Sequence, residues 1–136
     1  MKFPKLLYPS FLCLLIAGCD MIDYHPYDVH ISGETDVNAH NKAQIEQNCQ
    51  DMTTIRFVTL GDSQRCSAET DDFVSHLYTR DDIDFGIHGG DVSDFGVTDE
   101  FLWQRDIMNN LKIPYEVLLG NHACQGTVEE TNRVIF

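Results

Sequence analysis

Side chains that offer oxygen ligands directly follow glycine at three points of the 136-residue chain: Gly61-Asp62, Gly90-Asp91 and Gly120-Asn121. The intervals between the three oxygen-bearing residues are 29 and 30 residues, and each interval fits one strand–helix unit. An apolar run typical of a strand precedes each glycine. Because the carboxyl ends of parallel strands share one edge of a sheet, where open α/β sheets bind ligands, we expect the three positions to converge.

Together with Gln64, the side chains of Asp62, Asp91 and Asn121 would form a cluster of hydrogen-bond acceptors. Such a cluster is costly to assemble without a cation, so a divalent metal is its natural occupant. Two metal ions about 3.5 to 4 Å apart can share a carboxylate, activate a bridging water, and hold the attacking and leaving oxygens of a phosphoryl group. The spacing therefore predicts metal-assisted phosphoryl chemistry.

Three β-rich runs alternate with helical patterns, and this order would position the cluster. We expect strands over residues 55–60, 83–88 and 115–119, each stopped by glycine. We expect a polar helix over 37–49 capped by Thr35 or Asp36, helices opening at Thr70-Asp71-Asp72 and at Thr98-Asp99-Glu100, the second with Trp103 in the core, and an amphipathic segment from Thr127. Strands joined through single helices imply right-handed crossovers and a mostly parallel sheet, which is an α/β fold.

The three motifs resemble those that open the calcineurin-like metallophosphoesterases, namely D-x-H, G-D-x-x-D, and G-N-H followed by D or E. Here they stand as Asp62-Ser63-Gln64, Gly90-Asp91-Val92-Ser93-Asp94 and Gly120-Asn121-His122-Ala123. The resemblance covers residues 55–136 and implies a four-layer α/β/β/α sandwich, of which this chain would form the N-terminal half. It also implies hydrolysis of phosphate mono- or diesters at a two-metal site.

Carried over to this sequence, the resemblance implies that Asp62 binds one metal ion, Asp91 bridges two, and Asn121 binds the second. Gln64 stands where the family has histidine, so it offers an amide oxygen. Because an amide oxygen is a hard ligand, we expect manganese, magnesium or iron in the two sites rather than zinc.

The same resemblance implies that His122 donates a proton or hydrogen bond to the leaving oxygen, with Asp94 orienting its ring. Arg65, beside the first motif, would contact a phosphate of the phosphate-ester substrate. Ala123 departs from the acidic residue of the family, and the family's later histidine motifs would fall beyond Phe136. We therefore expect residues 1–136 to be a truncated member with little activity; the alternative is a non-catalytic or decayed lipoprotein that keeps the scaffold to bind a metal or ligand.

The first 18 residues read as a secretory signal, with a basic start and an apolar run too short to span a bilayer. Ile16-Ala17-Gly18-Cys19 resembles the lipobox of bacterial lipoproteins, in which the cysteine is acylated and becomes the new N-terminus. We expect a signal peptide over 1–18, an acylated tether over 19–36, and an incomplete phosphoesterase domain over 37–136. Such a protein would be lipid-anchored in the bacterial cell envelope, outside the cytoplasm, with the membrane as partner.

The chain carries 22 Asp and Glu against 9 Lys and Arg, a formal net charge of −13. Loss of residues 1–18 would remove two lysines and make the charge −15. Nucleic-acid binding is excluded on this ground, because affinity for nucleic acids comes largely from Lys and Arg that neutralise phosphates. With 43% hydrophobic residues the chain can bury a core, and the oligomeric state is left open.

Three cysteines would remain unacylated after the signal is removed, namely Cys49, Cys66 and Cys124. At least one thiol must stay free, and any of three pairings is possible. For Cys124, packing or a disulfide is favoured over a role as nucleophile. His88 ends an apolar run and is interpreted as a packed or supporting residue rather than a metal ligand.

Overall fold

A computed structural model of the chain describes residues 25, 28–123 and 127–136. The expected signal peptide, Cys19, part of the expected tether, and Cys124 lie outside the described residues. Within the part that is described, none of the helices combines the length and apolar character that crossing a bilayer requires. Cys49 and Cys66 are both free thiols.

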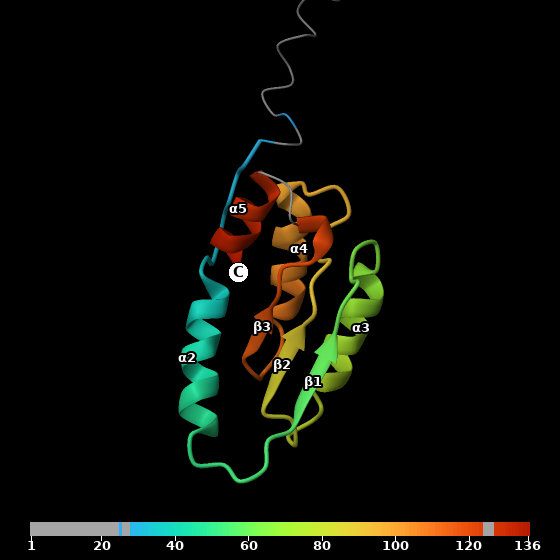
Figure 1. Ribbon diagram of the computed structural model, residues 1–136. Helices are drawn as coiled ribbons and strands as arrows, with labels where there is room; N and C mark the ends of the chain where they lie inside the picture. Colours follow the sequence, from blue (N-terminus) through green and yellow to red (C-terminus); the bar gives the residue numbers. More distant parts are fainter. Residues whose placement is uncertain (1–24, 26–27, 124–126) are drawn as a thin grey trace, which may run out of the picture.

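The strands β1 (Phe57–Leu60), β2 (Phe85–His88) and β3 (Tyr115–Val117) form one sheet in the order β1-β2-β3 (Figure 1). Both neighbouring pairs are parallel. The predicted parallel α/β arrangement is therefore confirmed, and each strand is two residues shorter at one end than expected. This sheet and its helices are the part of the expected sandwich that the described residues contain.

The helices are α2 (Val37–Cys49), α3 (Ser67–Leu77), α4 (Thr98–Met108) and α5 (Thr127–Ile135), with a short 3₁₀ helix η2 (Asn121–Ala123) after β3. The bounds of α2 and the first residues of α4 and α5 agree with the sequence analysis. α3 connects β1 to β2, and α4 connects β2 to β3, so each crossover contains a single helix (Figure 1).

The start of α3 differs from the prediction by three residues. Thr70 was expected to open the helix, but its N–H and its hydroxyl both donate to the carbonyl of Cys66, at 2.9 and 2.8 Å. Its side chain therefore bonds back along the helix instead of capping the N-terminus, a known behaviour of threonine inside helices.

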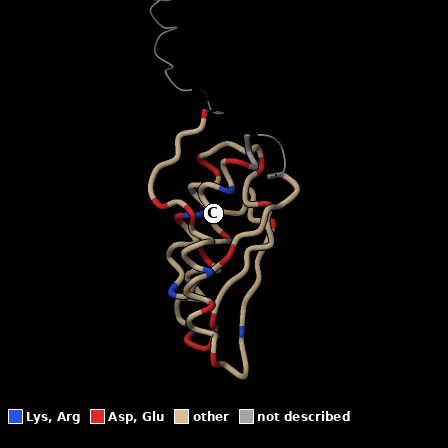
Figure 2. The backbone as a smooth tube through the Cα atoms, turned by 60° about the vertical axis from the view of Figure 1, so that its left-hand side comes forward, with Lys and Arg blue, Asp and Glu red and all other residues tan. Residues whose placement is uncertain are grey.

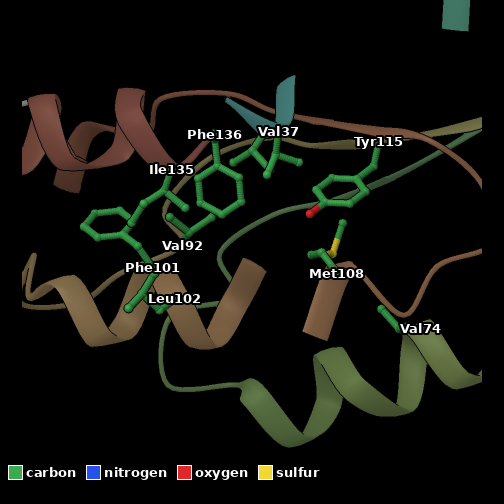
Figure 3. Packing of buried hydrophobic residues seen from close by; sticks show 10 residues of the cluster. Val37, Val74, Val92, Phe101, Leu102, Met108, Tyr115, Ile135 and Phe136 are labelled. Atoms are coloured by element: carbon green, nitrogen blue, oxygen red, sulfur yellow. The ribbon is translucent and has the colours of Figure 1, made fainter. Parts of the chain in front are cut away.

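In the hydrophobic core, one face of α4 packs against residues of the sheet and against the last two residues of the chain (Figure 3). Thr98, Phe101, Arg105 and Met108 are buried at the three- to four-residue spacing of one helix face, and Leu102 is buried beside them. The expectation that Trp103 belongs to the core is wrong, since its side chain is 59% exposed. Trp103 lies one residue beyond that spacing, so it points away from the buried face.

The open edge of β3 is covered by a side chain. The Asn38 amide donates to the carbonyl of Val117 at 2.7 Å, and its oxygen accepts the Val117 N–H at 2.8 Å. Asn38 thus satisfies both backbone groups of an edge position, as a further strand would. This contact attaches α2 to the sheet, and α2 lies beside β3 in Figure 1.

Candidate metal and phosphate site

The loops after β1 and β2 are hydrogen-bonded to each other at the carboxyl edge of the sheet. The N–H of Asp62 donates to the carbonyl of Gly90 at 3.3 Å, and the N–H of Gln64 donates to the carbonyl of Asp91 at 3.1 Å. Below them the N–H of Gly89 donates to Leu60 at 2.7 Å. The first two motifs, which are 29 residues apart in sequence, therefore meet through backbone contacts.

The third motif meets the second through the side chain of Asp91. Its carboxylate oxygen Oδ1 accepts the N–H of His122 at 3.1 Å. A Cβ at Gly120 would overlap this carboxylate, and a Cβ at Gly90, where φ is +101°, would come within 2.6 Å of Gly120. Glycine is needed at both places because the two loops approach more closely than a side chain allows.

Asp62 and Asp91 both hold left-handed backbone conformations, with φ of 52° and 54°. Arg65 does so as well, with φ of 64°. Aspartate adopts this region more readily than most residues, but each such residue still costs roughly 1–3 kcal/mol and is commonly found at functional sites. Three of them within two adjoining loops indicate that the surrounding contacts impose this geometry.

His88 and Gln104 hold the first loop from below. His88 is fully buried; its Nδ1 accepts the N–H of Gly90 at 3.1 Å, so the proton lies on Nε2, which donates to the Ser63 hydroxyl at 2.8 Å. The Gln104 amide donates to the Ser63 carbonyl at 3.0 Å. The interpretation of His88 as a packed supporting residue is confirmed.

Burial lowers the pKa of His88 to about 4, although the negative charges of Asp62 and Asp91 act to raise it. The ring is therefore neutral at physiological pH.

Ser63 and Gln104 were not singled out from the sequence. Ser63 was visible only as the variable middle residue of the first motif, and no local signal marks Gln104. Its role depends on the 41-residue separation that the fold closes.

Asp94 pairs with Arg65 rather than with His122. The Asp94 carboxylate, whose side chain is 10% exposed, accepts from Nε of Arg65 at 2.6 Å and from a terminal guanidinium nitrogen at 2.5 Å. This hydrogen bond and the Asp94 charge raise the pKa of Arg65 above its ordinary value. Among the described residues, the exposed ring of His122 has no hydrogen bond to Asp94, so the orienting role of Asp94 stays a prediction.

The residues at this edge fit a cation with oxygen ligands. The side-chain oxygen Oε1 of Gln64 is buried without a hydrogen-bond partner, which is unfavourable unless something outside the protein binds it. Two carboxylates and two amides, from Asp62, Asp91, Gln64 and Asn121, match the ligand preference of Mg²⁺ or Mn²⁺. Within the described residues no three His, Cys, Asp or Glu side chains form a metal-binding group.

A parallel α/β sheet whose strand-end loops carry these motifs defines the structural class of the molecule. The chain belongs to the calcineurin-like phosphoesterase family, whose family model matches residues 55–134. Members of this family generally use divalent metals. No curated protein and no solved structure matches the chain. The resemblance drawn from the three motifs is thus confirmed at the level of the family.

Proposed function

We propose that this protein is a phosphoesterase that uses two divalent metal ions to hydrolyse phosphate mono- or diesters. The observation that carries the proposal is the position of the Asp91 carboxylate, which is inserted between the tips of β2 and β3 and bonded to His122. The family match gives the reaction class, since the phosphoester is the group on which the family acts.

In this proposal Asp62 and Gln64 would hold one metal ion, Asn121 would hold the other, and Asp91 would bind both. The set of hard oxygen ligands favours manganese, magnesium or iron over zinc. When bound, the ions would polarise the phosphoryl group and provide a nucleophilic water. The left-handed backbone at Asp62 and at Asp91 turns the chain sharply after β1 and after β2. This geometry supports a role as metal ligand for each of the two aspartates.

The remaining residues act on the substrate itself. His122 is exposed beside Asp91 and can give a proton to the leaving oxygen. Arg65 can bind a phosphate oxygen through its second terminal nitrogen, because Asp94 engages only Nε and the first. Asp94 therefore acts as a positioning residue for the guanidinium.

Asp91→Asn tests the proposal. Asparagine tolerates the left-handed backbone and its oxygen can still accept the His122 N–H, so the fold should be kept while the bridging charge is lost. We expect manganese binding measured by calorimetry to weaken. Manganese-dependent hydrolysis of p-nitrophenyl phosphate and of its bis ester, which the unaltered chain should show at a low level, should fall to background.

Asp71→Asn is the matched control, because Asp71 is an exposed carboxylate on α3, in the helix that follows the site. It should leave turnover and manganese binding unchanged. Turnover in Asp91→Asn equal to that of the unaltered chain would remove the proposed bridging role.

A second function is favoured by one observation. Gln64 and Ala123 stand where the motifs of the family have histidine and an acidic residue. A chain that binds manganese through Asp91 but hydrolyses neither ester would be a non-catalytic metal- or ligand-binding module on the same scaffold.

We also propose that the protein is a lipoprotein of the bacterial cell envelope, acylated at Cys19 and held at the membrane outside the cytoplasm. The basis is the signal-like residues 1–18 and the lipobox-like sequence that ends at Cys19. Such an anchor requires no membrane-spanning helix.

A further inference from the structure

A pocket of about 170 Å³ adjoins Gln64, next to the proposed metal site. Its walls come from the loop after β1, the first residue of α3, the loop after β2 and the first turns of α4. An apolar cavity of about 150 Å³ is known to bind benzene. The pocket is therefore large enough for one aromatic ring.

Two aromatic side chains in the wall of this pocket are largely exposed. Phe95 is 66% exposed and Trp103 is 59% exposed. Neither joins the core, although each ring could bury a large apolar area. Glu100 lies three residues before Trp103 on α4, hence on the same helix face, and its carboxylate accepts the Phe95 N–H at 3.0 Å. The backbone that carries Phe95 is thus held in place.

A planar cation completes the wall. The Arg65 guanidinium lies 5.9 Å from the centre of the Phe95 ring, and the nearly buried Asp94 holds it from one side. Arg65 nonetheless remains 72% exposed. Aromatic rings and guanidinium planes are the surfaces on which nucleobases and other planar rings stack.

We propose that this pocket binds a planar aromatic group of the substrate, either a nucleobase or a simple aryl ring, with Phe95, Trp103 and Arg65 as its stacking surfaces. This inference rests on the proposed function, because the pocket would hold the organic part of an ester whose phosphate lies at the metal site. It narrows the substrate class to phosphate esters that carry a planar aromatic ring. Phosphates of glycerol or of a sugar without a base would lack the group that the pocket accepts.

Trp103 is the only tryptophan of the chain, so it reports on the pocket directly. Isotope-labelled protein should give one indole N–H resonance in a proton–nitrogen correlation spectrum. Adenosine and phenol serve as ligands and ribose as the non-aromatic control. All three lack phosphate, so binding is measured without metal and without hydrolysis.

We expect adenosine, phenol or both to shift the indole resonance in a saturable manner, and ribose to leave it in place. A response to adenosine alone would identify a nucleobase subsite, and a response to both a general aryl subsite. Absence of a shift with either aromatic ligand would overturn the proposal.

Phe95→Ala removes one stacking surface without opening the core, because Phe95 is exposed. We expect its affinity for the aromatic ligand to be about tenfold lower. Tyr78→Ala, which removes an exposed ring from the residue after α3, should leave the affinity unchanged. If the unaltered chain, Phe95→Ala and Tyr78→Ala all bind the aromatic ligand with the same affinity, the proposal is also overturned.

The esterase assay is a separate measurement. Hydrolysis without an indole shift would retain the proposed function and remove the aromatic subsite. An indole shift without hydrolysis would retain the subsite and remove the esterase function.

Discussion

Asp91 combines three constraints in one residue. Its backbone is left-handed, its carbonyl accepts the Gln64 N–H, and its carboxylate accepts the His122 N–H. Each contact comes from a different strand-end loop. A substitution at Asp91 that changes the charge while keeping these bonds therefore separates ligand chemistry from folding, which is why asparagine is the informative replacement.

His88 makes the stability of the fold depend on pH. Its pKa is lowered from 6.5 to about 4 by burial, so between these values the unfolded chain binds a proton that the folded chain does not. The free energy of unfolding should therefore decrease as the pH falls from 6.5 to 4, by at most about 3 kcal/mol, and His88 should contribute no further loss below pH 4.

His88→Gln should remove this contribution. Urea unfolding at a series of pH values should show a shallower acid dependence for the variant than for the unaltered chain, although its stability at pH 7 should be lower because the bonds to Ser63 and Gly90 are disturbed. His76→Gln, on the exposed side of α3, is the control. If the free energy of unfolding changes with pH equally in the unaltered chain and in His88→Gln, the lowered pKa of His88 does not cause the acid dependence.

At the scale of elements, the close approach of loops is what assembles the site. Gly61 and Gly120 occupy equivalent places, each one residue before an oxygen ligand, but their surroundings differ. A Cβ at Gly61 would find no atom closer than 3.7 Å, whereas a Cβ at Gly120 would overlap Asp91. The two glycines therefore form a matched pair.

Gly120→Ala should force the Asp91 carboxylate out of its position. We expect about 1–3 kcal/mol of destabilisation, as is typical of overpacking, together with loss of manganese binding measured by calorimetry. Gly61→Ala should retain manganese binding. If both variants bind manganese equally, the close approach of the loops after β2 and β3 does not position the ligand set.

The elements also show where local sequence signals are weak. The alternation of strands and helices was evident from hydrophobic periodicity, yet the start of α3 was placed at Thr70 because threonine and two aspartates are frequent at helix N-termini. Trp103 is expected in the core together with the other apolar residues of α4. Local composition shows neither that the Thr70 hydroxyl bonds back to Cys66 nor which face of α4 is buried.

At the scale of the whole molecule, acidic residues predominate along the backbone and the few basic residues lie apart (Figure 2). A net charge of −13 repels phosphate esters at long range. Bound divalent cations would offset this field at the site, so substrate binding should depend on metal more strongly than in a basic protein.

The proposed anchor is also a property of the whole chain. Cys19→Ser should abolish acylation, and the variant should appear in the soluble fraction when bacterial cells are separated into membranes and supernatant, because the acyl chains supply the affinity for the bilayer. Cys49→Ser, which changes a free thiol on α2, should stay with the membranes. A Cys19→Ser protein that remains in the membrane fraction would point to an uncleaved hydrophobic segment instead.

The amino-acid sequence by itself determined the α/β class, the order of the elements, the family and the three motifs, because periodicity and motif spacing are local or regular properties. Only the tertiary structure showed that Asp94 holds Arg65, that Gln104 supports Ser63, and that Trp103 faces a pocket. The first two relations join residues 29 and 41 positions apart, and the pocket joins Trp103 to Gln64 and Arg65 from the loop after β1. Such pairings depend on how closely the loops and helices pack. Packing distances are set by the complete fold, so no stretch of the sequence contains them.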